Sequence, residues 1–255
     1  MSPRTSRPRG GKAARDRGRA KPSAASSARP RSMSTGKRVW FRFSWLALGV
    51  FFRGVNRLTI SGTEHLPPGG GVLLAANHLS LFDTLLIPWA NIAAVGLEVV
   101  WAPAKAEIFE VPVVNRIIRS WGAFPVARGG RDLRAMRCLV ELMRHEKVML
   151  FPEGTRSADG RLGPGNRALG KLIYLARPRV IPTAIFGTDH LLPKGRVAPR
   201  LFGTLEVRFG PAVELESLYA ARDSKQTAES IVREVMRGIA RVRGEEAAWL
   251  ARFPA

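Results

Sequence analysis

The sequence predicts an α/β fold, with a mainly parallel sheet that helices cover on both faces. Short apolar runs alternate along the chain with turn residues and with longer segments whose apolar residues recur at helical spacing. Strands that alternate with helices in this way are typical of a parallel sheet buried between two helical layers. At 255 residues the chain is long enough for one sizeable domain with its own core.

The first elements lie between residues 58 and 126. A turn rich in Pro and Gly, at 67–71, separates a short strand from a continuously apolar one. Ser80 can cap a helix that begins just after it. The expected elements of this half are strands at 58–62, 72–76, 99–102 and 124–126, the helix after Ser80, and a helix at 113–121.

The second half continues the same alternation. A long amphipathic helix precedes a buried strand, and a polar loop at 153–166 follows that strand. The terminal helical region has a charged outer face, which is typical of a helix that covers the domain. The expected elements are helices at 133–145, 168–176 and 227–253 and strands at 148–151, 180–186 and 205–209.

Residues 1–38 form a strongly basic N-terminal segment. They contain 12 Lys or Arg and one Asp, a net +11 out of the formal +21 of the chain. Ser, Pro, Gly and Arg dominate, so this segment cannot bury enough apolar surface to offset its ordering entropy, and we predict a disordered basic tail. No apolar segment follows its charges before residue 39, which argues against a secretory signal. Cys138 is the only cysteine, which excludes an intramolecular disulfide.

Residues 39–55 form the most apolar segment near this tail. Arg42 and Arg53 bracket only ten residues, whereas a helix needs about 20 apolar residues to span a bilayer. Aromatic residues with flanking arginines are typical of a helix that lies in the membrane interface, and an ordinary core helix is the alternative. The neighbouring basic tail favours the interfacial helix, because anionic lipid attracts each nearby Lys or Arg by roughly 1 kcal/mol.

A histidine and a carboxylate follow the apolar strand 72–76. Positions five apart on an ideal helix are offset by about 140°, so His78 and Asp83 cannot pair within one regular helix. If Ser80 is the helix cap, Asp83 is the reciprocal acid of a capping box and His78 lies in the preceding loop. The ring of His78 could then fold back toward Asp83. The plainer interpretation makes Asp83 only a cap and His78 a satisfied polar residue at a strand end.

A second polar loop follows the strand 148–151. It brings together Glu153, Gly154, Thr155 and Arg156. Arginine binds phosphate through a bidentate fork, and loop N–H groups favour anions. Ligands of parallel sheets bind beyond the carboxyl ends of the strands, where both His78 and this loop are expected.

Two further cations extend the predicted anion site. Arg128 follows the short strand 124–126, which begins after Gly122. Lys105 is another phosphate candidate, with a solvated lysine as the plainer interpretation. Two arginines near one histidine describe a site for a phosphorylated substrate that carries a reactive hydroxyl.

With these stretches in order, the chain resembles the PlsC-like glycerophosphate/lysophosphatidate acyltransferase family over residues 56–240. The resemblance rests on four motifs, which are NHLSLFD at 77–83, GAFPVAR at 122–128, FPEGTRS at 151–157 and VIPT at 180–183. The fourth motif usually has an aliphatic residue where Thr183 stands, and Gly165-Asn166 replaces a Phe-Lys-like pair. These departures bear on acyl or acceptor preference rather than on the reaction.

The resemblance implies acyl transfer from acyl-CoA or acyl carrier protein to the sn-2 hydroxyl of 1-acyl-glycerol-3-phosphate, giving phosphatidic acid. His78 would take the hydroxyl proton, and Asp83 would fix its tautomer and stabilise the imidazolium. The remaining motif residues would bind or orient the acceptor. These expected substrate-binding residues are Lys105, Gly122, Arg128, Glu153, Gly154, Thr155 and Arg156.

The expected organisation is a tail at 1–38 and an acyltransferase domain at 39–255 that begins with the interfacial helix. No histidine or cysteine cluster has metal-ligand spacing, so we expect no metal, and the reaction calls for no cofactor beyond the acyl donor. The expected partners are a lysophospholipid, the acyl donor and an anionic membrane surface. We place the protein at the cytoplasmic face of the membrane, peripheral or monotopic.

Two rival functions stay open. The first keeps the fold and changes the acceptor to another lysophospholipid or an envelope glycolipid. The second is a basic nucleic-acid-binding protein, which the net charge suggests. The arginine-rich tail has no interleaved aromatic residues and no recognisable nucleic-acid module follows it, so specific nucleic-acid binding is not expected.

Overall fold

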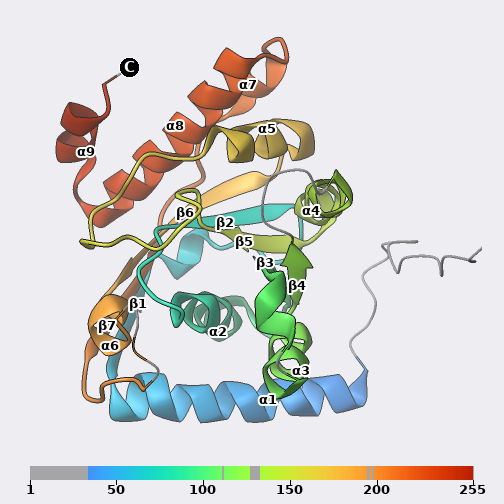
Figure 1. The fold of residues 1–255 in the computed structure, drawn as a ribbon, viewed down its shortest axis with the longest axis vertical. Coiled ribbons are helices and arrows are strands. Elements are labelled where there is room, and N and C mark those ends of the chain that lie inside the picture. Colours follow the sequence, from blue (N-terminus) through green and yellow to red (C-terminus); the bar gives the residue numbers. More distant parts are fainter. Residues whose placement is uncertain (1–33, 111, 127–132, 194–195, 197, 255) are drawn as a thin grey trace, which may run out of the picture. The chain divides into compact units, whose positions relative to one another are not determined.

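The computed structural model of the chain describes residues 34–110, 112–126, 133–193, 196 and 198–254. Within these residues the centre is a seven-stranded sheet with the order β1-β7-β6-β2-β5-β3-β4 (Figure 1). Its strands are β1 (Arg57–Ser61), β2 (Val72–Ala76), β3 (Val100–Lys105), β4 (Ala123–Val126), β5 (Lys147–Leu150), β6 (Arg179–Phe186) and β7 (Thr204–Phe209).

The sheet is mainly parallel, as the alternation of strands and helices predicts. The pairs β2·β5, β2·β6, β3·β5, β3·β4 and β1·β7 are parallel, and only β6 and β7 pair in opposite directions. The carboxyl ends of β2, β5 and β6 therefore meet at one edge of the sheet. The polar loops that follow these three strands are brought together there.

Helices separate the strands along the chain. They are α1 (Thr35–Gly49), α2 (Asp83–Val95), α3 (Pro112–Ser120), α4 (Leu133–His145), α5 (Arg167–Ala176), α6 (Thr188–Leu191), α7 (Glu216–Ala220), α8 (Lys225–Arg243) and α9 (Glu246–Arg252). The predicted strand 72–76 and helix 133–145 have the same bounds in the structure, and most other predicted elements differ by one or two residues at an end. The strand predicted at 99–102 is longer than expected, because it continues to Lys105.

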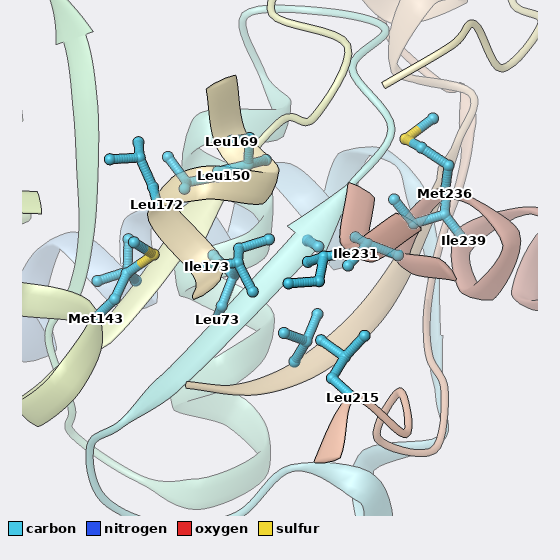
Figure 2. Packing of buried hydrophobic residues seen from close by; sticks show 14 of the residues in the cluster. Leu73, Met143, Leu150, Leu169, Leu172, Ile173, Leu215, Ile231, Met236 and Ile239 are labelled. Carbon is cyan, nitrogen blue, oxygen red and sulfur yellow. The ribbon is translucent and has the colours of Figure 1, made fainter. Parts of the chain in front are cut away.

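The central strands bury both faces, and successive residues enter different cores. Leu73 and Ala75 of β2 belong to a cluster with α4, α5 and α8, which Figure 2 shows around Leu73. Leu74 and Ala76 belong to a second cluster with α2 and the end of the N-terminal helix. This alternation confirms that helices cover both faces of the sheet, since a strand directs successive side chains to opposite sides.

The C-terminal helical region differs from the prediction of one helix over 227–253. Gly244 caps α8 with φ 78°, and its N–H donates to the carbonyls of Ala240 and Arg241. This left-handed residue ends α8 and turns the chain into α9. A glycine inside a helical pattern near its charged end is the local signal for that break.

The N-terminal helix begins earlier than expected. Ser34 caps α1 by accepting a hydrogen bond from the N–H of Lys37, so residues 35–38 are helical and do not belong to the predicted tail. The rest of the predicted disordered tail lies outside the described residues. After Gly49 the helix widens into a π-helical turn, η1 (Val50–Val55), which leads directly into β1.

One face of α1 packs on the domain. The rings of Trp45 and Trp89 stack at 5.4 Å, and each indole N–H donates to the main-chain carbonyl of the other residue. Phe41 and Phe52 are buried on the same side. The core-helix interpretation of 39–55 therefore holds for this face.

The other face of α1 is exposed and apolar. Val39, Phe43, Leu46 and Val50 repeat at intervals of three or four residues and are each at least 60% exposed. We call these four residues the α1 stripe. In the described part of the chain, no helix combines the length and hydropathy needed to cross a bilayer.

The close packing of α5 on α8 predicts that a side chain added at Gly170 destabilises the protein. A Cβ atom added there would lie 1.9 Å from the carbonyl oxygen of Ala228, whereas one added at Gly36 in α1 would meet nothing within 4 Å. We expect Gly170→Ala to lower the free energy of unfolding by about 1–3 kcal/mol or more, because the two helices must separate. Gly36→Ala is the matched control and should raise it by up to about 1 kcal/mol. Urea denaturation of both variants checks this, and equal stabilities would contradict the packing argument.

Candidate active site

The loops after β2 and β5 meet at the carboxyl edge of the sheet. The main-chain N–H of His78 donates to Oε1 of Glu153 at 3.2 Å, and the N–H of Ser157 donates to the carbonyl of His78 at 2.7 Å. Both main-chain groups of His78 are therefore held by the 153–157 loop. The predicted meeting of the two loops at one edge of the sheet is confirmed.

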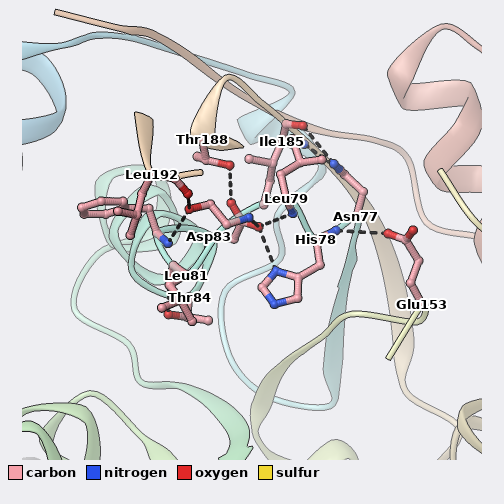
Figure 3. A network of polar contacts seen from close by, with 12 residues as sticks. Asn77, His78, Leu79, Leu81, Asp83, Thr84, Glu153, Ile185, Thr188 and Leu192 are labelled. Atoms are coloured by element: carbon pink, nitrogen blue, oxygen red, sulfur yellow. Dashed lines mark hydrogen bonds and ion pairs between the residues drawn. The ribbon is translucent and has the colours of Figure 1, made fainter. Parts of the chain in front are cut away.

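The imidazole of His78 pairs with the carboxylate of Asp83. Nδ1 lies 2.9 Å from Oδ2 of Asp83, as Figure 3 shows. A carboxylate can only accept, so this contact places the ring hydrogen on Nδ1 and leaves Nε2 as the acceptor. The side chain of Asp83 is fully buried, and that of His78 is 14% exposed. This pairing leaves Nε2 of His78 without a hydrogen bond to any described residue.

Asp83 begins α2 and also receives three hydrogen bonds from the surrounding loops. Oδ2 accepts from the N–H groups of Leu79 and Ser80 at 2.6 and 2.8 Å, and Oδ1 accepts from the hydroxyl of Thr188 (Figure 3). His78 precedes the helix and Asp83 lies in its first turn, as helical geometry requires. Asp83 is thus more than a cap, since the same oxygen serves the loop and the imidazole.

The predicted capping box is only half present. The carboxylate of Asp83 reaches back to the N–H of Ser80, but the hydroxyl of Ser80 does not bond the N–H of Asp83. Instead it donates to the carbonyl of Leu192 at 2.9 Å and accepts from Phe82 N–H at 3.4 Å. Residue 82 becomes the N-cap, without a side-chain hydrogen bond. The hydroxyl that the local sequence predicts to cap the helix therefore bonds instead to Leu192, in the distant segment after β6.

Packing also fixes the orientation of the imidazole. The ring of Phe151 lies parallel to that of His78, with centroids 3.8 Å apart and an interplanar angle of 11°. Phe151 follows β5, in the same motif that supplies Glu153. One face of the imidazole is therefore covered by an apolar ring while its edge bonds to Asp83.

Glu153 orients the loops through its carboxylate. Oε1 accepts from His78 N–H, and Oε2 accepts from Gly163 N–H at 3.0 Å. Burial raises the pKa of this carboxyl, and the two N–H groups, Arg243 and His78 partly oppose that rise. The described contacts of Glu153 are therefore those of a residue that orients the two loops.

Arg156 is the cation of the 153–157 loop, which bonds the main chain of His78. We call the pair His78 and Asp83 the dyad. The side chain of Arg156 is half-buried and makes no hydrogen bond or ion pair with other described residues. Gly154 forms the turn before it with φ 72°, and Thr155 is exposed. The guanidinium is therefore available to an anionic ligand at the edge where His78 lies.

The other predicted phosphate ligands are less closely tied to the dyad. Arg128 lies outside the described residues. Lys105 ends β3 at the carboxyl edge, two strands away from β2, and its exposed side chain pairs with no other described residue. It stays a candidate by position only.

Gly122 lies at the opposite edge of the sheet from the dyad. It precedes β4, which runs parallel to β3, so it stands at the amino end of that strand. Its φ is 95°, and an added Cβ would lie 2.9 Å from the carbonyl oxygen of Val100. The prediction that Gly122 contacts the substrate is therefore not supported, because a tight turn accounts for the glycine.

Two residues that sequence reasoning did not select also hold the site together. Thr188 follows β6 and donates to Asp83, while Asn77 exchanges two hydrogen bonds with the main chain of Ile185 at 2.8 and 3.0 Å (Figure 3). Both residues are buried. Because β6 neighbours β2, the rule that directs attention to strand carboxyl ends could have found Thr188.

The long loop that carries Arg156 is held by the C-terminal helices. The guanidinium of Arg243, in the last turn of α8, donates to the carbonyl of Gly160, and the indole of Trp249 in α9 donates to the carbonyl of Gly163. Among the described residues, no group of three or more His, Cys, Asp or Glu side chains could hold a metal ion. The chemistry available at this edge is therefore that of a buried acid, an imidazole and a free guanidinium.

The sequence and fold match known acyltransferases. The family model described as Acyltransferase matches residues 57–186, just over half of the chain. The crystal structure of the 1-acyl-sn-glycerophosphate (LPA) acyltransferase PlsC from Thermotoga maritima superposes with a TM-score of 0.60 at 27% identity, covering 81% of this chain and 79% of that one.

Curated plant proteins show the same similarity. The chain is 28% identical over 159 residues to the chloroplastic 1-acyl-sn-glycerol-3-phosphate acyltransferase BAT2 of Brassica napus, covering 59% of this chain and 43% of that protein. It is 32% identical over 148 residues to the 1-acyl-sn-glycerol-3-phosphate acyltransferase of Limnanthes alba, covering 56% and 50%. The chain thus spans half or less of the length of these two relatives.

The hydrogen bond from Thr188 predicts a stability difference between two conservative variants. Thr188→Val removes the hydroxyl from a buried carboxylate and keeps the shape, so we expect the free energy of unfolding to fall by about 1.5–3 kcal/mol. Thr188→Ser keeps the donor and should lose less. Urea denaturation at neutral pH measures both, and a valine variant as stable as the serine variant would contradict this role of the hydroxyl.

Proposed function

The chain belongs to the acyltransferase family, and from this premise we propose that it acylates the sn-2 hydroxyl of 1-acyl-glycerol-3-phosphate, giving phosphatidic acid. The observation that carries the proposal is the 2.9 Å contact between His78 and Asp83 beside the loop of Arg156. The acyl donor is a thioester, either acyl-CoA or acyl carrier protein. No further cofactor is required, because the donor supplies both the acyl group and the leaving thiol.

His78 acts as the general base in this reaction. Its Nε2 takes the proton of the acceptor hydroxyl while the oxygen attacks the thioester carbonyl. The new C–O bond forms, the C–S bond breaks, and the imidazolium returns the proton to the departing thiolate. Such proton transfer contributes roughly 10²–10⁴-fold in rate. The substrate hydroxyl is the nucleophile, so no nucleophilic side chain of the protein takes part.

Asp83 keeps the imidazole in the reactive tautomer. Hydrogen bonding from Nδ1 leaves Nε2 unprotonated and stabilises the imidazolium after proton transfer, as the acid does in a Ser-His-Asp triad. Phe151 and Glu153 act as positioning residues, since they contact the ring and the main chain of His78. This support keeps the base in one orientation during the reaction.

Arg156 binds the phosphate of the acceptor. Its guanidinium has no partner among the described residues and lies on the loop that bonds the main chain of His78. A bidentate fork to the phosphate would hold the glycerol hydroxyl at a defined distance from the base. We assign Arg128 to the same phosphate on the basis of its motif, and Gly154 and Thr155 to the turn that presents Arg156.

The protein works at a membrane surface, since its acceptor and product are lipids. The α1 stripe is exposed along one face of a helix that also carries the exposed Arg42 and Arg53. A helix of this composition lies in the interface with its apolar face among the acyl chains and its arginines at the headgroups. We propose a peripheral or monotopic association with the cytoplasmic face of the membrane.

A lipid product assay tests the general base. Purified full-length protein is incubated with labelled acyl-CoA or acyl carrier protein and 1-acyl-glycerol-3-phosphate in mixed vesicles. We expect His78→Ala to lower kcat by about 10²–10⁴-fold, because the hydroxyl loses its proton acceptor. His190→Ala is the matched control, since its exposed ring lies on α6, and it should retain activity. Activity that survives loss of His78 would exclude the mechanism.

Arg156→Ala tests the acceptor. Removing a bidentate phosphate ligand should raise KM for 1-acyl-glycerol-3-phosphate by about 10-fold or more and leave KM for a neutral monoacylglycerol unchanged. Arg161→Ala in the same loop is the control, because this exposed side chain forms its one ion pair among the described residues with Asp159. An unchanged KM for lysophosphatidate would favour an acceptor without this phosphate, such as an envelope glycolipid.

A further inference from the structure

The loop before β7 carries an apolar tip that packing does not explain. Phe202 is 82% exposed, the largest fraction among the exposed large apolar residues described, and its neighbour Leu201 is 53% exposed. The φ of Phe202 is 63°, in the left-handed region that bulky residues rarely adopt. A strained and exposed aromatic side chain contributes little to folding, and exposed apolar side chains of this kind mark sites of contact with a ligand, a partner or a membrane.

The tip is held beside the end of the N-terminal helix. Gly203, the next residue, donates to Oδ1 of Asn56 at 2.9 Å and accepts from the N–H of Arg57 at 2.9 Å. Asn56 is buried and follows η1 directly, so the tip stands next to the end of η1, the turn that begins with Val50 of the α1 stripe. In Figure 1 the orange loop after α6 reaches the light-blue end of this helix.

The charged residues within the two segments that carry the stripe and the tip have a single sign. Residues 34–57 contain Lys37, Arg38, Arg42, Arg53 and Arg57 and no Asp or Glu. On the loop, the exposed residues 196 and 200 are both arginine, and no acidic residue lies between 196 and 203. Apolar side chains bordered by cations match an anionic lipid surface better than they match another copy of this basic chain.

We propose that Leu201 and Phe202 form a second membrane-inserting point, which enters an anionic bilayer beside the α1 stripe. The proposal rests on the membrane association proposed above for α1. A helix in the interface touches the lipid only along its own length. A second apolar point beyond the end of that helix extends the contact and restricts the orientations that the domain can take on the lipid surface.

The orientation on the membrane affects the dyad, because the segment after β6 that carries Leu201 and Phe202 also contacts the loop of the dyad. Thr188 bonds Asp83, the carbonyl of Leu192 accepts from Ser80, and the N–H of Arg200 donates to the carbonyl of Leu191. On the other side, Phe51 of η1 stacks on Phe82, the residue before Asp83, at 5.3 Å. Both membrane points therefore connect through one or two contacts to the loop of the dyad, which places that loop close to the lipid from which the acceptor comes.

Site-specific fluorescence tests insertion directly. Phe202→Cys is made in a Cys138→Ala background and labelled with an environment-sensitive nitrobenzoxadiazole probe. Vesicles of phosphatidylglycerol and phosphatidylcholine, with and without a nitroxide-labelled lipid, are then added to the full chain. We expect a blue shift and quenching by the nitroxide. A probe at Leu175→Cys is the control, because that exposed leucine belongs to α5, which lies on the opposite side of the sheet from α1 (Figure 1).

A probe at Leu46→Cys in the stripe separates the two proposals. Insertion at residue 46 with a water-exposed probe at 202 would overturn the second point while α1 association stands. Exposed probes at both positions would overturn both membrane proposals without touching the mechanism of His78, which the product assay measures. A probe at 202 that is buried without vesicles, in a dimer seen by light scattering, would show a protein partner instead and also overturn the proposal.

Flotation with the same vesicles measures how much the ring of Phe202 contributes to membrane binding. Phe202→Asn keeps a residue that tolerates the left-handed conformation and removes the apolar ring, so we expect vesicle binding to weaken by about 10-fold or more. Phe202→Trp should bind as the wild type does. Equal binding by the asparagine variant and the wild type would contradict insertion of the ring.

Discussion

A carboxylate without access to water must find its hydrogen bonds inside the protein, and the candidate site is arranged around this requirement of Asp83. Its two oxygens accept from Leu79, Ser80, Thr188 and His78, which come from the loop after β2 and the loop after β6. Leaving such a charge unsatisfied would cost far more than any one of these contacts contributes. Burial of Asp83 therefore couples the start of α2, the end of the sheet and the imidazole into one unit.

Hydrogen bonds between side chains and main-chain groups also hold the loop that carries Arg156. Glu153 accepts from His78 and Gly163, and the C-terminal helices hold the far part of the loop through Arg243 and Trp249. A phosphate ligand on a long polar loop can thus keep a fixed position relative to the base. That arrangement is what a proximity effect requires, since the hydroxyl and the base must be aligned before the proton moves.

The N-terminal helix has one face packed on the domain and one face exposed to solvent. Its inner face stacks Trp45 on Trp89 and joins the second core, whereas the α1 stripe belongs to none of the described core clusters. The core-helix interpretation of residues 39–55 therefore holds for the inner face, and the interfacial interpretation stays a prediction for the exposed face. With Phe202 beside its end, the exposed side forms a basic and apolar face near the dyad, which fits the proposed lipid substrates.

The sequence by itself determined the fold class, most element positions and the loops at which His78, Asp83, Glu153 and Arg156 lie, because hydrophobic periodicity and strand ends are local signals. Helical geometry, with Ser80 as the expected cap, also placed His78 before the helix and Asp83 in its first turn. Only the tertiary structure decided the partners that come from distant segments. Thr188 at Asp83, Leu192 at Ser80 and Phe202 beside Asn56 all depend on strand order and chain reversal. Contacts across more than a hundred residues leave no periodic trace in the sequence, so they became visible only when the sheet was assembled.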